Sequence, residues 1–417
     1  MVPQQVAKRN GLVRAWFARA QVNPFRSAVV RWVLSGDQLL ILTNAGVVHA
    51  LDANTGQTLW VTPVGNPDYP SLGPAANDSL VGLVNGSTLY LLDRSSGRVV
   101  SERVLGGAPG AGPALGRDYV FVPLMSGRIE GYPLGDDGGT VWFYQSFGRA
   151  FAPPLATPQS IVWGTTAGYL YVGRVSVPGI RFRLEAAGEF LTSPAYRPPL
   201  IYSVTRDGET FAVDEQQGRL RWKFVTSFPT ERAPAAVGDR VYVSTEEPML
   251  HAIDADRGLG AWDAPGISQF AAASPTRVYG VDRFGTIHIL DRATGASVSQ
   301  IPTGGTLTAL VNDQTDRLYL ISNSGLVQCL HEIGAEKPTY YYDRPTAPEP
   351  TPPSDEAYRG DGEPATTPER PPVAPRPLPP TEDDPFAKPA DESGFEDPFA
   401  DEAPPPADTG IDDNPFD

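Results

Sequence analysis

The sequence predicts an all-β protein, a single eight-bladed β-propeller of four-stranded blades with a disordered C-terminal tail. Three observations predict it: an internal repeat of about 40 residues, short β-type runs within each repeat, and a sharp change of composition near residue 343. Four strands in about 40 residues are typical of a propeller blade. We expect an N-terminal arm with a ring-closing strand at 1–27, the propeller at 28–342, and a Pro-rich acidic tail at 343–417.

The repeat is carried by three ladders of residues with one period. Turn glycines recur at Gly46, Gly86, Gly127, Gly168, Gly208, Gly285 and Gly325, with Pro248 at the one gap. Prolines, expected just before the first strand of a unit, recur at Pro74, Pro113, Pro154, Pro194, Pro234 and Pro275. Aromatic side chains recur at Trp60, Trp142, Phe182, Trp222 and Trp262. The ladders together predict eight units.

Each unit has the pattern of β-strands and hairpins. In the first unit, apolar runs at 28–34, 39–43, 47–51 and 57–60 are separated by Asn, Asp and Gly turn residues. A helical solenoid is disfavoured because the hydrophobic period is close to 2 and glycines interrupt every 10–12 residues. The Gly-His and Trp-Asp dipeptides typical of WD40 propellers do not recur.

Asp, Gly and Trp hold fixed places in the repeat, and the segment 50–60 follows the pattern A-x-D-x-x-T-G-x-x-x-W. The Asp and Gly form a tight turn between the last two strands, and the Trp packs between neighbouring blades. The positions are Asp52, Gly56, Trp60, Trp142, Asp214, Gly218, Trp222, Asp254, Gly258, Trp262, Asp291 and Gly295. Over residues 28–335 the pattern resembles the PQQ-like (quinoprotein-type) propeller repeat family. Units three and four depart most, and we expect the least regular blades there.

Ring closure is expected from the segment 12–17, which precedes the first complete unit and would complete blade eight beside residues 318–330. An open blade edge would invite pairing with another chain, so a closing strand is needed. Two alternatives remain open. The segment 12–17 forms an amphipathic helical arm, or residues 337–342 supply the strand.

Enzymatic chemistry is not predicted, although the resemblance raises the question. Quinoprotein dehydrogenases use a bound quinone, a calcium ion and a catalytic carboxylate, and no set of residues matches those calcium ligands. We therefore expect no catalytic residue, no cofactor and no metal. His49, His251 and His288 share one repeat position, but they lie in separate blades and are expected to be structural. The single cysteine, Cys329, excludes an internal disulfide and is expected to be a buried strand residue.

The tail has its own composition and its own motif. Residues 343–417 hold 20 acidic and 5 basic side chains and 20 of the 44 prolines, whereas Leu, Ile, Val and Phe number 7, too few to form a core. Three [Asp/Asn]-Pro-Phe tripeptides recur there: Asp384, Pro385 and Phe386; Asp397, Pro398 and Phe399; Asn414, Pro415 and Phe416. On a flexible tether they would bind a partner with avidity. The alternative is a solubilising tail in which Phe recurs without binding.

The function that we expect is a non-catalytic scaffold for protein partners, which bind through the propeller loops and the tail. The chain is similar to the propeller subunit of the bacterial outer-membrane β-barrel assembly machine, which implies a role in cell-envelope assembly and a periplasmic or envelope location. The alternative function is a propeller enzyme or a small-ligand sensor that uses the central channel. A monomer is favoured.

Other partners and locations are limited by the same sequence. Nucleic acid is not expected as a partner, because residues 1–342 are nearly neutral and carry no basic stripe. No run of about 18 apolar residues predicts a membrane span. No apolar leader follows Met1, which fits a cytoplasmic protein or a true start upstream.

The tail composition gives the first testable prediction. Limited proteolysis should leave a stable fragment that ends near Tyr342, because residues 343–417 have too little apolar surface to fold. Deleting them should leave the melting temperature unchanged. A melting temperature that falls by many degrees on deletion would contradict this prediction.

Overall fold

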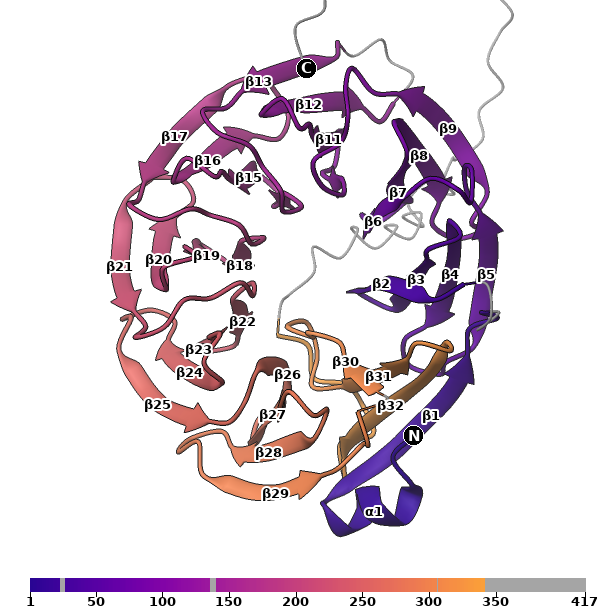
Figure 1. The fold of residues 1–417 in the computed structure, drawn as a ribbon, viewed down its shortest axis with the longest axis vertical. Coiled ribbons are helices and arrows are strands. Elements are labelled where there is room, and N and C mark those ends of the chain that lie inside the picture. Colours follow the sequence, from indigo (N-terminus) through magenta and orange to yellow (C-terminus); the bar gives the residue numbers. More distant parts are fainter. Residues whose placement is uncertain (23–26, 136–139, 306, 342–417) are drawn as a thin grey trace, which may run out of the picture. The chain divides into compact units, whose positions relative to one another are not determined.

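The ring of eight blades is plain in the structure, a computed structural model that describes residues 1–22, 27–135, 140–305 and 307–341. The chain divides into two units, Met1–Ala347 and Pro348–Asp417, and every described residue belongs to the first. There, eight four-stranded antiparallel sheets stand around a central axis (Figure 1), which confirms the predicted eight-bladed propeller. The predicted tail and its tripeptides lie outside the described residues.

The strands fall into four positions, counted from the axis outward. The innermost strands are β2 (Val29–Ser35), β6 (Ser71–Ala76), β10 (Ala114–Leu115), β14 (Leu155–Ala156), β18 (Ala195–Arg197), β22 (Ala235–Val237), β26 (Gln269–Ala273) and β30 (Leu307–Ala309). The second strands are β3 (Gln38–Thr43), β7 (Leu80–Asn85), β11 (Tyr119–Pro123), β15 (Ser160–Gly164), β19 (Leu200–Val204), β23 (Arg240–Ser244), β27 (Arg277–Val281) and β31 (Leu318–Ser322).

The third strands are β4 (Val47–Asp52), β8 (Thr88–Asp93), β12 (Arg128–Pro133), β16 (Tyr169–Arg174), β20 (Glu209–Asp214), β24 (Met249–Asp254), β28 (Ile287–Asp291) and β32 (Leu326–Glu332). The outer strands are β5 (Thr58–Pro63), β9 (Val99–Val104), β13 (Trp142–Gln145), β17 (Ile180–Glu185), β21 (Leu220–Val225), β25 (Gly260–Pro265), β29 (Ser297–Ile301) and β1 (Leu12–Arg19). Blade one holds β2–β5, and the blades follow in chain order to blade eight, which holds β30–β32 and β1.

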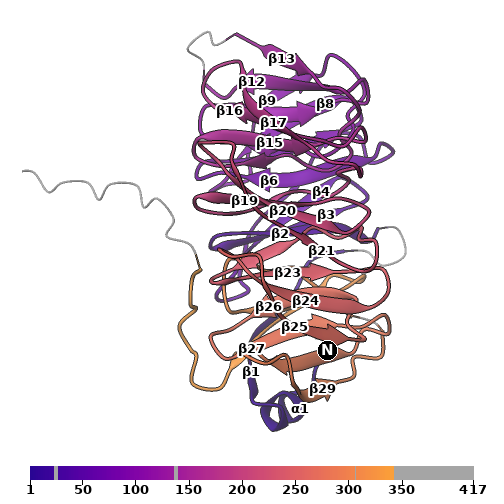
Figure 2. The ribbon, with the colours of Figure 1, turned by 90° about the vertical axis from the view of Figure 1, so that its left-hand side faces the viewer.

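Burial follows strand position. All six residues of β3 are buried, because both of its faces contact neighbouring blades, whereas β9 alternates between half-buried and exposed residues. A half-buried strand alternates because successive side chains point to opposite faces. In Figure 2 the outer strands β17, β21 and β25 lie one below another along the side of the ring. The core is therefore a series of layers between blades rather than one central core.

The blades predicted to be least regular have the shortest innermost strands. β10 in blade three and β14 in blade four have two residues each. The predicted place of the prolines was wrong for two of the six. Pro74 lies within β6, where the register with β7 shifts, and Pro275 lies in the turn after β26. An inner edge strand tolerates a missing N–H at such a shift, which explains Pro74.

β1 closes the ring. It pairs antiparallel with β32, from Leu12 opposite Glu332 to Arg19 opposite Leu326, so the first strand of the chain completes the last blade. A short helix, α1 (Gln4–Arg9), precedes it, so a helical arm is also present, ahead of the strand. The alternative strand from residues 337–341 does not form. Tyr340 makes only an isolated bridge to Thr315.

An aromatic ring on a turn glycine joins five of the eight pairs of neighbouring blades. A Cβ built at the glycine would lie closer than 3.0 Å to the ring, so only glycine fits, and each glycine also has a positive φ. The pairs are Trp16 with Gly56, Trp60 with Gly97, Phe182 with Gly218, Trp222 with Gly258, and Trp262 with Gly295. The indole N–H of each tryptophan also donates to a backbone carbonyl of the same turn, at 2.8 to 3.1 Å.

The remaining seams show why the pattern breaks. Ser101 and Ser299 occupy the aromatic position in blades two and seven, and the blades that follow lack the Asp-Gly turn. At the seam of blades seven and eight, α1 supplies apolar side chains instead. Val2 and Ala7 are buried in one cluster with Ile287 and Ile301. Trp142 of blade three packs on Gly131 of its own blade, and its buried indole N–H has no hydrogen-bond partner among the described residues.

The seam geometry predicts a difference between two glycines with equal backbone conformation. Gly258 and Gly266 have φ of 71° and 84°, but a Cβ at Gly258 would lie 2.5 Å from the ring of Trp222, whereas one at Gly266 meets nothing within 4 Å. Gly266→Ala should lower the free energy of unfolding by about 1 kcal/mol through backbone strain alone. Gly258→Ala should lower it by about 3 kcal/mol, because the ring must also move. Urea denaturation measures both, and equal losses would contradict the proposed contact.

Candidate functional site

The conserved-looking acids of the repeat serve the turns. Oδ1 of Asp52 accepts the backbone N–H groups of Asn54 and Thr55 and the Thr55 hydroxyl. The same arrangement recurs at Asp214, Asp254 and Asp291. These bonds stabilise the carboxylate, and the Thr294 hydroxyl and N–H lower the pKa of Asp291 below its usual value. The predicted repeat positions therefore hold turns and seams and do not converge on one site.

The three histidines at one repeat position also stay apart. His49 is buried in blade one, and its Nε2 has no hydrogen-bond partner among the described residues. In blade six Nδ1 of His251 lies 2.7 Å from Asp263, and in blade seven Nε2 of His288 lies 3.2 Å from Asp282. In the described part of the chain, no group of three or more His, Cys, Asp or Glu side chains could hold a metal ion.

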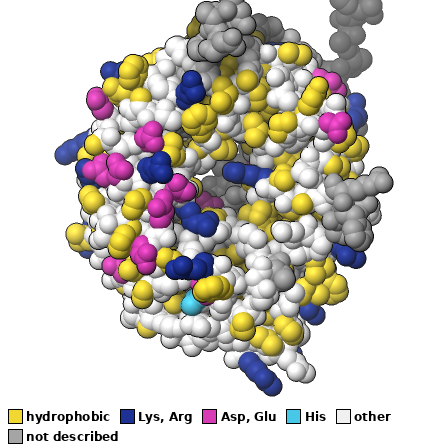
Figure 3. Space-filling view, viewed as in Figure 1, with side chains coloured by type: hydrophobic (Ala, Val, Ile, Leu, Met, Phe, Trp, Pro, Cys, Tyr) yellow, Lys and Arg dark blue, Asp and Glu magenta, His cyan; other side chains and the backbone are white. Residues whose placement is uncertain are grey.

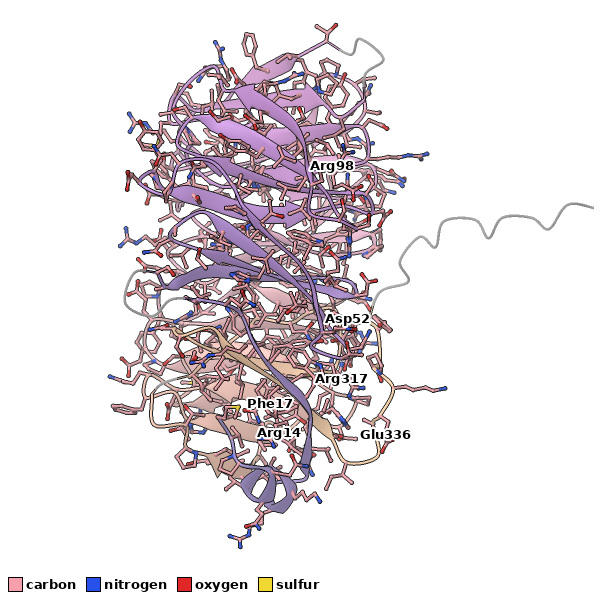
Figure 4. All side chains as sticks on the ribbon, turned by 90° about the vertical axis from the view of Figure 1, so that its right-hand side faces the viewer. Arg14, Phe17, Asp52, Arg98, Arg317 and Glu336 are labelled. Carbon is pink, nitrogen blue, oxygen red and sulfur yellow. The ribbon has the colours of Figure 1, made fainter. Side chains whose placement is uncertain are left out.

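Cys329 is a core residue at the ring closure. It lies in β32 between Trp16 of β1 and Tyr319 of β31, and it is 1% exposed. Burial raises the pKa of the Cys329 thiol to about 12, so the thiolate is absent at neutral pH. In Figure 4 the labelled Arg317 and Glu336 lie beside this closure, and the Arg317 guanidinium donates to the Glu336 carbonyl at 2.8 Å.

An exposed apolar surface lies on the connection between blades three and four. We call it the Phe147 surface, and it comprises Met125, Phe147, Arg149 and Phe151, all exposed. Phe147 is 68% exposed, Phe151 43% and Met125 41%. The two chain segments that carry them are adjacent, because a Cβ at Gly127 would meet the carbonyl oxygen of Gly148. The ring of Phe147 contacts Tyr169 at 5.8 Å between centroids, edge to face.

The backbone that carries this surface is fixed by hydrogen bonds. The N–H of Phe147 donates to the Tyr171 hydroxyl at 3.1 Å. The N–H of Arg149 donates to the Thr166 hydroxyl at 3.1 Å, and the Arg149 carbonyl accepts the Thr166 N–H at 2.9 Å. Because the backbone polar groups are used within the protein, the apolar side chains are presented to solvent in a fixed arrangement. Such a surface suits a protein partner rather than a reaction.

The face shown in Figure 3 gathers hydrophobic side chains over blades two and three, above the central opening. Charged side chains of both signs lie mainly over the blades on the opposite side of the opening. Sequence reasoning missed the Phe147 surface. The only signal was two phenylalanines in a Gly-containing connection, and their exposure depends on which side chains the neighbouring turns supply.

Comparison with protein families supports the repeat assignment. Residues 160–337 match a family model of PQQ-like repeats described as outer membrane protein assembly factor BamB. A protein of that name from Burkholderia pseudomallei is 25% identical over 274 residues, which are 64% of this chain and 63% of the relative. One from Yersinia pestis is 21% identical over 330 residues, 70% of this chain and 81% of the relative. The match therefore spans less than two thirds of the Burkholderia protein.

Solved structures show the same fold. BamB from Moraxella catarrhalis superposes with a TM-score of 0.62 at 21% identity, over 77% of this chain and 97% of that one. The computationally designed Ika8 protein gives a TM-score of 0.60 at 17% identity, over 76% of this chain and 99% of that one. None of the helices formed by the described residues is long and apolar enough to cross a membrane. The blade geometry and these comparisons identify the chain as a PQQ-like β-propeller protein similar to outer membrane protein assembly factor BamB.

Proposed function

We propose that the chain is a non-catalytic scaffold in outer-membrane protein assembly and that a protein partner docks on the Phe147 surface. The observation that carries the proposal is a pair of exposed phenylalanines, Phe147 and Phe151, on a connection whose backbone is already hydrogen-bonded. A preorganised apolar surface loses little conformational entropy on binding. The relatives named as assembly factors support the role, and a cell-envelope location follows from it.

Arg149 fits the same docking role. Its side chain is exposed between the two phenylalanines, and arginine and aromatic side chains are enriched at interface hot spots. The ring fixes the surface in space, because both flanking blades are held by their own sheets. Partner binding therefore needs no rearrangement of the propeller.

The tail offers a second docking element for the same function. Its three Asp-Pro-Phe or Asn-Pro-Phe tripeptides lie within residues 384–416 and would bind a partner that has an apolar pocket for Phe. A single Phe in a pocket contributes about 1.5–3 kcal/mol, so each copy is weak and three gain by avidity.

The proposal is tested by affinity purification from the native host with the full-length chain. Phe147→Ser combined with Phe151→Ser should lower recovery of envelope-assembly partners at least tenfold, because two buried phenyl groups are lost from the interface. Phe284→Ser is the matched control, since Phe284 is 72% exposed on a turn of blade seven. Mass spectrometry identifies the partners.

Two outcomes separate the docking elements. If the phenylalanine variant keeps every partner and replacing Phe386, Phe399 and Phe416 by Ser removes them, the tail is the docking element and the Phe147 surface is not. If no variant changes recovery, the docking proposal is wrong.

A further inference from the structure

Two arginine side chains line a cavity on the ring axis without an acidic partner. The cavity has a volume of about 630 Å³ and is formed by the inner strands and connections of blades one, five, six, seven and eight. Arg31 comes from β2, after a shift in register with β3, and Arg232 comes from the connection before β22. Figure 3 shows the opening at the axis with Lys and Arg side chains beside it. Among the described residues, neither guanidinium makes an ion pair.

Other arginines with little exposed side chain in this protein are saturated. Arg94 pairs with Asp37 at 2.9 Å and donates to the carbonyl of Asn77. Arg292 pairs with Asp239 at 2.8 Å and donates to two carbonyls. Arg317 pairs with Asp316 and donates to two carbonyls of the segment that follows β32. A charge within a protein is normally paired, so the free donors of Arg31 and Arg232 are an exception that calls for a ligand.

The position of Arg232 is built rather than incidental. Nη1 of Arg232 donates to Oε1 of Gln269 at 3.0 Å, and Nε2 of Gln269 donates to the Ala309 carbonyl at 3.1 Å. This chain of bonds crosses blades six, seven and eight and leaves the other guanidinium donors free. Burial in the channel lowers the pKa of Arg31 and of Arg232, which shows that the charges stand in a partly desolvated setting.

The rest of the cavity limits the ligand. Apolar side chains form part of its wall, among them Trp32, Phe270, Leu310 and Val311. A second pocket of about 700 Å³ over blades six and seven shares Glu231, Arg232, Ser244 and Gln269 with it, so the space continues from the axis to the surface. An elongated space with cations and an apolar wall suits an extended chain better than a small ion. A guanidinium fork matches a carboxylate in two parallel hydrogen bonds.

We propose that this channel site binds an extended acidic peptide segment of a partner protein, with carboxylates on Arg31 and Arg232 and apolar side chains against Trp32 and Phe270. Two acids also line the space. Glu231 lies 3.6 Å from Arg206, and Asp313 stands in the cavity with its pKa raised to about 6 by burial. The site is separate from the Phe147 surface, so each proposal can fail without the other.

Fluorescence anisotropy with the full-length chain tests the site. The probe is a labelled eight-residue peptide of alternating glutamate and leucine, at low salt because exposed charge interactions are screened by added ions. Arg31→Gln and Arg232→Gln should each weaken binding about tenfold, the effect of losing a charged hydrogen-bond donor. Arg98→Gln is the control with the same change of charge, since Arg98 is exposed on a turn of blade two and labelled in Figure 4.

Further variants separate a lost contact from a damaged cavity. Arg31→Lys keeps the charge but loses the fork, so it should bind with intermediate affinity. Asp313→Asn removes a carboxylate from the same cavity and should not weaken binding. A peptide of alternating lysine and leucine should not bind. The proposal is overturned if the arginine variants behave like Arg98→Gln, if Asp313→Asn weakens binding as much as they do, or if inorganic phosphate at the peptide's own concentration displaces the probe.

Discussion

An aromatic ring lying on a turn glycine of the next blade is the contact on which the ring depends. The glycine is required twice, because its φ is positive and because a Cβ would enter the aromatic ring. The indole N–H then satisfies a carbonyl of the same turn, so one side chain supplies both apolar burial and a hydrogen bond. Replacing a buried tryptophan by alanine typically costs about 3–5 kcal/mol. Repeated around the ring, the contact sets both the period of the sequence and the angle between blades.

Function follows from where that contact is missing. Blade three is flanked by the two seams that depart from the pattern, with Ser101 on one side and the unpartnered indole of Trp142 on the other. The Phe147 surface lies on the connection that leaves this blade. The rigid ring elsewhere presents this surface and holds the inner strands around an axial cavity. A scaffold needs both properties, because a fixed frame lets a few exposed side chains carry binding.

The sequence predicted the parts of the fold that repeat. The period, the turns at Asp52 and its equivalents, and the seam role of Trp60, Trp222 and Trp262 all follow from local spacing. Trp16 was missed as a member of the aromatic series, because its strand β1 is separated by the whole ring from its partner β32. The Phe147 surface and the two channel arginines could not be predicted, since exposure and pairing depend on several blades at once. The predicted proline positions failed where the register shifts, at Pro74, and in a turn, at Pro275.

Hydrogen exchange of the tryptophan indole groups, followed by NMR, tests the closed ring most directly. The N–H groups of Trp16, Trp60, Trp222 and Trp262 all donate to turn carbonyls of the next blade. If β1 closes the ring as one cooperative structure, the four signals should exchange at one slow rate that tracks global unfolding. If Trp16 exchanges many times faster than Trp60 and Trp222, the seam between blades eight and one opens separately, and the account of a closed ring is wrong.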